Sequence, residues 1–137
     1  MDSIVIETGL PALAEILDLY KSVGWTAYTS VPEALYRAVQ NSRHRYFVRQ
    51  NGQLIGLLRA VGDGETIVYV QDILIRPEHQ RKGFGKALLQ QLREESAQIR
   101  QFVLLTDDRP DKAAFYERCG LIPAQKAGCA CFLAFNG

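Results

Sequence analysis

The chain has 137 residues, a formal net charge of +1 at pH 7, 47% hydrophobic residues and 23% charged residues. This length suits one domain with its own core, and the composition is that of an ordinary soluble globular protein. The small net charge argues against a nucleic-acid partner, which needs a clustered basic face, and no apolar run reaches the roughly 18 residues that a membrane span needs. The chain carries three cysteines and starts without the basic and apolar regions of a signal peptide. We therefore expect a single cytoplasmic domain, residues 1–137, with reduced thiols and no membrane partner.

The first forty residues predict one strand and two helices. Residues 3–7 alternate between polar and apolar side chains, as in a half-buried strand. Pro11 then opens a helix that carries apolar side chains at helical spacing and ends near Gly24. A loop over residues 25–31 leads to Pro32, which opens a second helix.

The middle of the chain predicts three strands and a helix. Residues 45–49 and 53–60 are two strands joined by Asn51-Gly52, a strong two-residue hairpin signal. A β-branched strand covers residues 67–75, and a helix follows from about residue 82 to about residue 99.

The last third adds a strand over residues 101–106 and a helix that starts at Pro110, runs through Arg118 and is capped by Gly120. Residues 121–124 and 129–135 are expected to complete the sheet with two further strands. The order is β-α-α-β-β-β-α-β-α-β-β, which indicates an α+β fold with a mixed sheet.

The turn between strand 67–75 and the following helix contains Gln80-x-x-Gly83-x-Gly85. A helix N-terminus offers unpaired backbone N–H groups and the positive end of the helix dipole, both of which favour an anion. Gly83 permits a tight turn, Gly85 removes a side chain that would hold a phosphate away, and Arg81 and Lys82 add positive charge. The sequence therefore predicts a cradle for a phosphate, in particular a diphosphate.

Two common glycine-rich phosphate loops do not match this turn. A dinucleotide-binding loop needs a third glycine where this chain has Leu88, and a P-loop needs Ser or Thr where it has Ala87. The remaining alternative is a strand-turn-helix whose glycines serve tight packing alone.

Gln80-Arg-Lys-Gly83-Phe-Gly85 resembles the Gln/Arg-x-x-Gly-x-Gly/Ala motif of the GCN5-related N-acetyltransferase (GNAT) family. Residues 72–77 look like the fourth strand of that family, and residues 114–121 look like its Tyr-containing helix. The likeness covers roughly residues 45–135. It implies a three-layer sandwich with a mixed, mostly antiparallel sheet, and an acetyl-CoA-dependent N-acetyltransferase (an acyltransferase) acting on a primary amine.

The resemblance also implies where coenzyme A would bind. The pantetheine would lie along the fourth strand at a bulge, and the backbone amides of the glycine turn would hold the pyrophosphate. The cofactor-binding residues expected on this basis are Ile73, Leu74, Ile75, Arg81, Lys82, Gly83, Phe84, Gly85 and Lys86. The three strand residues would also serve as core.

Two residues are expected to take part in the chemistry. In the family a tyrosine at the position of Tyr116 often donates a proton to the departing thiolate, and a phenol is protonated at neutral pH; the alternative is a packed aromatic side chain. Where many members have an asparagine seven residues earlier, this chain has Arg109. Asp72 is the favoured general base; the alternatives are that its carboxylate is structural or binds the ammonium group of the substrate. Asp107 and Asp108 are further candidates for the general base.

The acceptor site is expected around Trp25, Tyr28 and Gln71. Aromatic side chains in the loop that closes over the acceptor in this family suggest an apolar or aromatic amine. The spacing of Trp25 and Tyr28 is weakly similar to that of plant plastid serotonin acetyltransferases. The alternative is that Trp25 fills the core beneath the loop.

Three rival functions remain open: acetylation of a protein N-terminus or lysine, a non-catalytic acyl-CoA sensor, and a nucleotide-binding module. We favour a small-molecule amine because the chain has little spare length for a protein-binding groove. Cys129 and Cys131 lack the partners of a zinc site, so no metal is expected. A terminal strand at residues 129–135 could pair between subunits, which makes a homodimer plausible.

Overall fold

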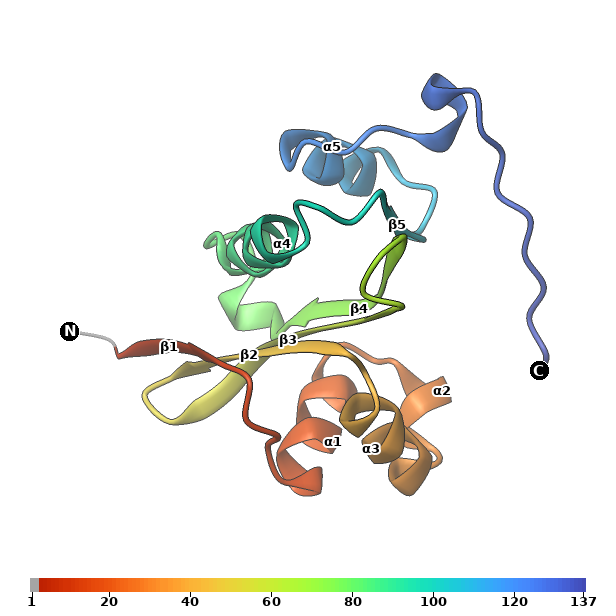
Figure 1. Cartoon of the computed structure of the whole chain (residues 1–137). Helices are drawn as coiled ribbons and strands as arrows, with labels where there is room; N and C mark the ends of the chain where they lie inside the picture. The colour runs from red at the N-terminus through yellow and green to blue at the C-terminus, as the bar shows by residue number, and fades with distance from the viewer. Residues whose placement is uncertain (1–2) are drawn as a thin grey trace. The chain divides into compact units, whose positions relative to one another are not determined.

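The computed structural model describes residues 3–137. They divide into two compact units, a first one that ends at Leu105 and a second one that covers Thr106–Gly137. The first unit holds a five-stranded sheet with helices on both of its faces (Figure 1). The second unit holds one α-helix, one short 3-10 helix and an extended C-terminal segment.

The sheet has the strand order β1-β2-β3-β4-β5. Its strands are β1 (Ile4–Glu7), β2 (His44–Gln50), β3 (Gln53–Gly62), β4 (Ile67–Ile75) and β5 (Gln101–Leu104). The first four pair antiparallel to one another, and β5 pairs parallel to β4. The expected mixed, mostly antiparallel sheet is confirmed.

One face of the sheet is covered by α1 (Leu13–Ser22), the short α2 (Thr26–Thr29) and α3 (Pro32–Gln40). The apolar side chains of α1 and α3 recur every three or four residues, so they form one stripe that packs against inward-facing residues of β2, β3 and β4. The buried residues of this core include Ile16, Leu19, Leu35, Val39, Phe47, Leu57 and Leu74. This packing holds α1 against the sheet.

The other face of the sheet is covered by α4 (Phe84–Glu95), which buries Leu88, Leu89 and Leu92. The Tyr46 hydroxyl donates a hydrogen bond to the Glu95 carboxylate, which ties β2 to the end of this helix. Helices on both faces give the first unit the expected three layers (Figure 1).

The hairpin between β2 and β3 forms as the sequence predicts. Asn51 and Gly52 have φ angles of 51° and 83°, the two left-handed residues that the tight turn of a two-residue hairpin requires. Asparagine and glycine tolerate this conformation better than other residues, so the turn is decided locally.

The helix boundaries differ from the expected ones at three places. The helix expected from about residue 82 to about residue 99 begins at Phe84 and ends at Glu95. The first helix runs from Leu13 to Ser22, and the expected loop at residues 25–31 contains the helical turn α2. Helix α5 (Pro110–Arg118) has the expected bounds, and Gly120 has a φ of 88° after its end.

The last two expected strands are absent from the described residues. Pro123 caps the short 3-10 helix Ala124–Ala127, so residues 121–124 do not extend into a ladder. Residues 129–137 belong to no helix or ladder and are exposed. Alternating apolar residues indicate that a segment can form a strand, but the strand forms only where a partner edge meets it.

Candidate active site

A β-bulge lies in β4 at the centre of the candidate site. Arg59 of β3 pairs with Asp72, whereas the neighbouring Ala60 pairs with Val70, so Gln71 is an extra residue in β4. Such a bulge bends its strand and re-aims the side chains beside it. Gln71 is exposed here, and Asp72 is buried on the face covered by α1.

Beyond the bulge, β4 lacks a strand partner on its outer side. Strand β5 pairs only with Ile67–Val70, and no other described strand pairs with residues 71–75 on that side. The Arg76 amide donates to the Ile55 carbonyl of β3. Since alternate backbone groups of a strand point to opposite sides, Ile73 and Ile75 direct theirs away from β3. This open edge can accept an extended ligand.

The end of β4 is held rigidly. Arg76 is buried, donates from Nε to the Leu54 carbonyl at 2.7 Å and pairs with Asp18 of α1 at 2.6 Å. The Gln80 side chain donates to the Ile75 carbonyl at 3.0 Å. These bonds fix the chain between the open edge and the following helix.

The glycine turn has two left-handed residues close together. Gly83 has a φ of 88° and is the N-cap of α4, and Arg81 has a φ of 64°. Among residues 3–137 only Arg81 and Asn51 are non-glycine residues with positive φ, a conformation that costs about 1–3 kcal/mol for such residues. Strained backbone of this kind clusters at ligand-binding loops. The sequence alone did not predict the left-handed conformation of Arg81.

The N-terminus of α4 is open to an anion. The first hydrogen bond of the helix runs from the Ala87 amide to the Gly83 carbonyl at 3.0 Å. The amides of Phe84, Gly85 and Lys86 therefore precede any intrahelical acceptor and add to the positive end of the helix dipole. The side chains of Arg81, Lys82 and Lys86 surround the turn, and Arg81 and Lys82 are exposed. A turn with these amides and basic side chains could hold an anion such as a pyrophosphate.

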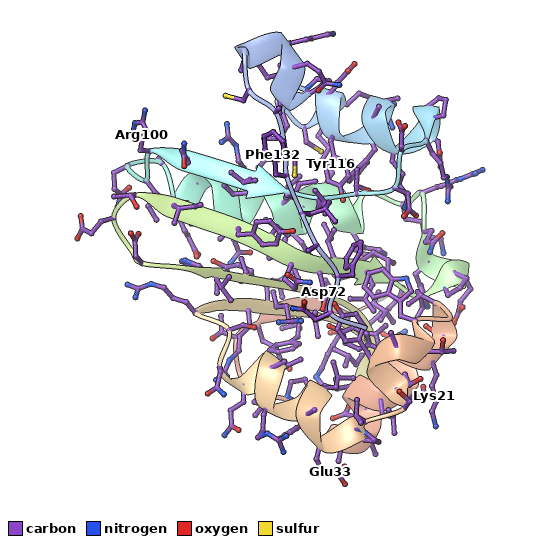
Figure 2. All side chains as sticks on the ribbon, turned by 90° about the vertical axis from the view of Figure 1, so that its right-hand side faces the viewer. Lys21, Glu33, Asp72, Arg100, Tyr116 and Phe132 are labelled. Atoms are coloured by element: carbon purple, nitrogen blue, oxygen red, sulfur yellow. The ribbon has the colours of Figure 1, made fainter. Side chains whose placement is uncertain are left out.

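Asp72 is the centre of a buried hydrogen-bond network between the sheet and helix α1 (Figure 2). Its Oδ2 accepts from Arg59 Nε at 2.6 Å and from the Tyr20 hydroxyl at 2.8 Å. Its Oδ1 accepts from the Tyr28 hydroxyl at 3.1 Å, and that hydroxyl accepts from Gln71 Nε2 at 3.2 Å. Oδ2 thus accepts two hydrogen bonds and Oδ1 accepts one, and the charge of the carboxylate is balanced by Arg59. This geometry favours the structural alternative for Asp72.

The aromatic residues of this network form one cluster. Tyr20 lies 5.8 Å from Trp25 and 5.4 Å from Tyr28, measured between ring centroids, and Trp25 lies 6.1 Å from Tyr28. Trp25 and Tyr28 are half-buried and pack against the core beneath α1 and α3. The Arg59 guanidinium lies 5.9 Å from the Tyr28 ring centroid. Part of the Trp25 side chain therefore fills the core, and the rest of its ring is open to solvent.

Tyr20 is fully buried, and its ionisation is opposed by its surroundings. Burial raises the pKa of the Tyr20 phenol well above its ordinary value, and the nearby Asp72 carboxylate raises this pKa further. Tyr20 therefore stays protonated and keeps donating to Asp72 at any ordinary pH.

Tyr116 belongs to the second unit, on α5. It is half-buried and packs edge to face with Phe115 at 5.0 Å between ring centroids. Burial raises the pKa of the Tyr116 phenol, while a hydrogen bond with Thr106 acts in the opposite direction. The backbone amide of Leu121 donates to the Tyr116 carbonyl at 3.1 Å, which closes the end of the helix. The phenol is thus held in its protonated form.

The remaining candidates of the second unit are exposed. Arg109 stands where the family often has asparagine, and its guanidinium pairs with Asp111 at 2.6 Å. Asp107 and Asp108 are exposed.

The sequence reasoning missed Tyr20, Arg59 and Ser42 as members of the Asp72 network. Ser42 accepts from the Arg59 guanidinium at 3.3 Å. The sequence did contain an indication of this network. Arg59 is the single charged residue in the apolar run 54–61, and Asp72 is the single charged residue in the apolar run 67–75. A buried charge needs a partner of opposite charge, so a single charge in each of two adjacent buried strands predicts an ion pair between them.

Neither a metal site nor a membrane-spanning helix is found in residues 3–137. No cluster of three or more His, Cys, Asp or Glu side chains in that range could hold a metal ion. No helix of the same residues has the length and apolar character needed to cross a membrane.

Comparison with known proteins identifies the family. The family model described as "Acetyltransferase (GNAT) family" matches residues 10–121. The chain belongs to the GNAT family. The sequence resemblance is thereby confirmed, and so is the fold class that it implied.

Individual relatives agree with this assignment. An uncharacterized N-acetyltransferase, ycf52, of Pyropia yezoensis is 29% identical over 114 residues, which cover 80% of this chain and 64% of the relative. A glucosamine 6-phosphate N-acetyltransferase of Schizosaccharomyces pombe is 28% identical over 53 residues, 39% of this chain and 48% of that one. This chain thus spans less than two thirds of the length of these curated relatives.

Solved structures share the fold over the whole chain. A GNAT-family acetyltransferase of Streptococcus pneumoniae TIGR4 has a TM-score of 0.85 and 29% identity, covering 99% of this chain and 98% of that chain. The aminoglycoside N-acetyltransferase AAC(6′)-Iy, solved in complex with CoA, has a TM-score of 0.66 and 15% identity. This match covers 100% of this chain and 97% of that chain. At this identity the second match concerns the fold alone.

Proposed function

We propose that this protein is an N-acetyltransferase that moves an acetyl group from acetyl-CoA to a primary amine of a small molecule. The observation that carries the proposal is the continuous path from the open edge of β4, beyond the Gln71 bulge, to the N-terminus of α4. An extended chain ending in a diphosphate matches such a path, and pantetheine pyrophosphate has this form. Membership of the GNAT family supports the same cofactor.

Each part of the path has a role toward coenzyme A. The backbone groups of Ile73 and the backbone amide of Ile75 would bind pantetheine and the thioester, while Leu74 packs in the core. The amides of Phe84, Gly85 and Lys86 would bind the pyrophosphate, helped by the left-handed turn at Arg81 and Gly83. The side chains of Lys82 and Lys86 would add positive charge at the rim.

The acetyl transfer itself is a direct attack in a ternary complex. The neutral amine nitrogen forms a bond to the thioester carbonyl carbon, the amine gives up a proton, and the carbon–sulfur bond breaks. Tyr116 would give its phenolic proton to the departing thiolate and regain one from solvent. The raised pKa of Tyr116 keeps the phenol protonated at neutral pH, which a proton donor requires.

We propose that Asp72 positions the acceptor site and does not take the proton of the amine, which then leaves to water. Its two oxygens already accept hydrogen bonds from Arg59, Tyr20 and Tyr28. A base must reach the amine directly, whereas this carboxylate is buried and paired with Arg59. The carboxylate instead holds the buried Tyr20 and orients Tyr28, whose ring would border the acceptor.

The proposed acceptor is an aromatic or apolar amine. The Arg59–Asp72 pair is electrically balanced, so it offers no excess negative charge to a polycationic substrate. The rings of Trp25 and Tyr28 offer stacking surface, and Gln71 is exposed beside them. An amine with one ring matches these surroundings better than a protein segment.

The chain offers a direct probe of this site, because Trp25 is its only tryptophan. Titration of acetyl-CoA by calorimetry comes first, with ATP and NAD as controls. Aromatic amines, aliphatic amines and an N-terminal peptide are then titrated in the presence of CoA while Trp25 emission is followed. Thiol release with acetyl-CoA measures turnover.

The outcomes separate the alternatives. Selective CoA binding with turnover of an aromatic amine supports the proposal. CoA binding without turnover of any amine would point to a sensor, and turnover of the peptide alone would point to protein acetylation. Preference for ATP or NAD over CoA would contradict the cofactor assignment.

A further inference from the structure

Gln71 is the exposed end of the hydrogen-bond network around Asp72. The Asp72 carboxylate accepts from the Arg59 guanidinium and from the Tyr28 hydroxyl. That hydroxyl in turn accepts from the Gln71 side-chain amide. Arg59 and Asp72 are buried, whereas Gln71 is the exposed extra residue of the β4 bulge. The network therefore connects a buried ion pair to a side chain that a ligand can reach.

The buried ion pair decides the direction of the hydrogen bonds that lead to Gln71. An ionised carboxylate can only accept, so the Tyr28 hydroxyl must use its single proton on Asp72 Oδ1, at 3.1 Å. The Tyr28 oxygen can then only accept from its other neighbour, Gln71 Nε2, at 3.2 Å. With the Gln71 amide turned over, two acceptor oxygens would face each other. The amide is therefore held with Nε2 toward Tyr28 and Oε1 away from it.

This arrangement leaves Gln71 Oε1 available as a hydrogen-bond acceptor. The oxygen makes no hydrogen bond within residues 3–137. Gln71 lies two residues before Ile73, about 7 Å along the strand, and the open edge of β4 begins after Val70. The free oxygen thus belongs to a side chain that adjoins both the edge proposed for the thioester and the Tyr28 ring proposed to border the acceptor.

We infer that Gln71 is a specificity-determining residue whose Oε1 accepts a hydrogen bond from the N–H of the attacking amine. The inference rests on the proposed function and names the group that selects the acceptor. An amine must be neutral to attack, and an amide oxygen binds its N–H without adding charge, whereas a carboxylate in this place would favour the ammonium form. The oriented amide therefore selects a neutral hydrogen-bond donor and disfavours a ligand that presents an acceptor.

The orientation of the amide is measured first, without any ligand. In NMR spectra of isotope-labelled protein, the side-chain NH2 signals of Gln71 are those that Gln71→Met lacks. They should shift in Tyr28→Phe, which keeps the ring and removes the hydroxyl. They should keep their parent positions in Tyr36→Phe, whose lost hydroxyl bonds the Pro11 carbonyl. Gln71 signals that are the same in Tyr28→Phe and in the parent would overturn the orienting role of Tyr28.

The contact with the acceptor is tested by kinetics with phenethylamine, a primary amine with one ring. Gln71→Met keeps the length of the side chain and removes both polar atoms, so KM for the amine should rise at least tenfold while CoA affinity stays at the parent value. Tyr28→Phe should also raise KM, because the amide is then free to turn over. The double variant should raise KM no more than Gln71→Met alone, since the two residues act through one hydrogen-bonded chain.

Gln53→Met is the matched control for the kinetics. Gln53 is an exposed glutamine at the start of β3, beside the hairpin turn, and its variant should have the KM of the parent. A parent-like KM in Gln71→Met would exclude the contact with the amine. Additive effects of Gln71→Met and Tyr28→Phe would show that Tyr28 does not act through Gln71.

Gln71→Glu tests the neutrality of the group. A carboxylate beside the bound amine favours the ammonium form, so the acid limb of the kcat profile should move to higher pH by about 1 unit. A limb that stays in place or moves to lower pH would contradict the inference. If the parent acetylates no amine, the proposed function fails and the acceptor role of Gln71 fails with it, while the NMR spectra alone decide the orientation of the amide.

Discussion

Arg59 and Asp72 form a buried ion pair across two neighbouring strands. They are register partners in β3 and β4, and Arg59 Nε lies 2.6 Å from Asp72 Oδ2. Their side chains are 8% and 2% exposed, so each would be an uncompensated buried charge without the other. The pair lies at the bulge of β4, and it therefore links the stability of the sheet to the shape of the candidate site.

Asp72→Asn is expected to lower the free energy of unfolding by about 3–5 kcal/mol, because it leaves the Arg59 guanidinium buried without a counter-charge. The double variant Arg59→Met with Asp72→Leu should recover most of this loss, since it removes both charges. Urea unfolding of the three proteins measures these differences. A stable Asp72→Asn protein whose kcat falls a hundredfold would instead identify Asp72 as the general base.

Gly83→Asp is expected to weaken CoA binding at least tenfold, which corresponds to about 1.4 kcal/mol. The substitution places a negative charge beside the pyrophosphate and strains a residue with a φ of 88°. Gly52→Asp is the matched control, because Gly52 has a φ of 83° and likewise has no heavy atom within 4 Å of an added Cβ. Calorimetric titration should find parent-like affinity in the control. Equal loss in both variants would mean that strain alone, and not a phosphate site, explains the effect.

Tyr116→Phe is expected to lower kcat by about 10²–10³ while CoA affinity stays at the parent value, because it removes a proton donor and keeps the ring. Burial holds the pKa of the Tyr116 phenol above its ordinary value of 10.0, so the activity of the parent should not fall through loss of this proton below that pH. Tyr36→Phe is the control, since the Tyr36 hydroxyl bonds the Pro11 carbonyl outside the site. Unchanged kcat in Tyr116→Phe from pH 6 to pH 9 would exclude the role of proton donor.

Stability should decline at alkaline pH through Tyr20. Its folded-state pKa is raised above the ordinary value of 10.0 by burial and by Asp72, so the folded state holds the proton more tightly than the unfolded state. The stabilisation is complete below about pH 10 and is lost as the pH rises from there toward the folded-state pKa, by about 1.4 kcal/mol per pH unit for one proton.

Urea unfolding between about pH 8 and pH 11 tests this dependence. Tyr20→Phe should have a shallower decline than the parent, and adding Tyr46→Phe should flatten it further, because burial also raises the pKa of Tyr46. A decline in Tyr20→Phe as steep as in the parent would show that Tyr20 is not its source.

The elements set by local chemistry could be predicted from the sequence. The Asn51-Gly52 turn, the bounds of β4 and the helix opened by Pro110 each depend on the backbone preferences of a few adjacent residues. The same holds for the glycine turn before α4, whose motif also identified the family.

Features that depend on partners distant in the sequence were decided only by the tertiary structure. Asp72 could be ranked as a base from its position, but its bonds to Tyr20 and Arg59 join residues 52 and 13 positions away. The segment at residues 129–135 has the pattern of a strand, yet whether it forms one depends on an edge that the pattern does not contain. Local propensity fixes turns and helix ends, whereas burial of a charge or pairing of a strand requires contacts that only the folded chain brings together.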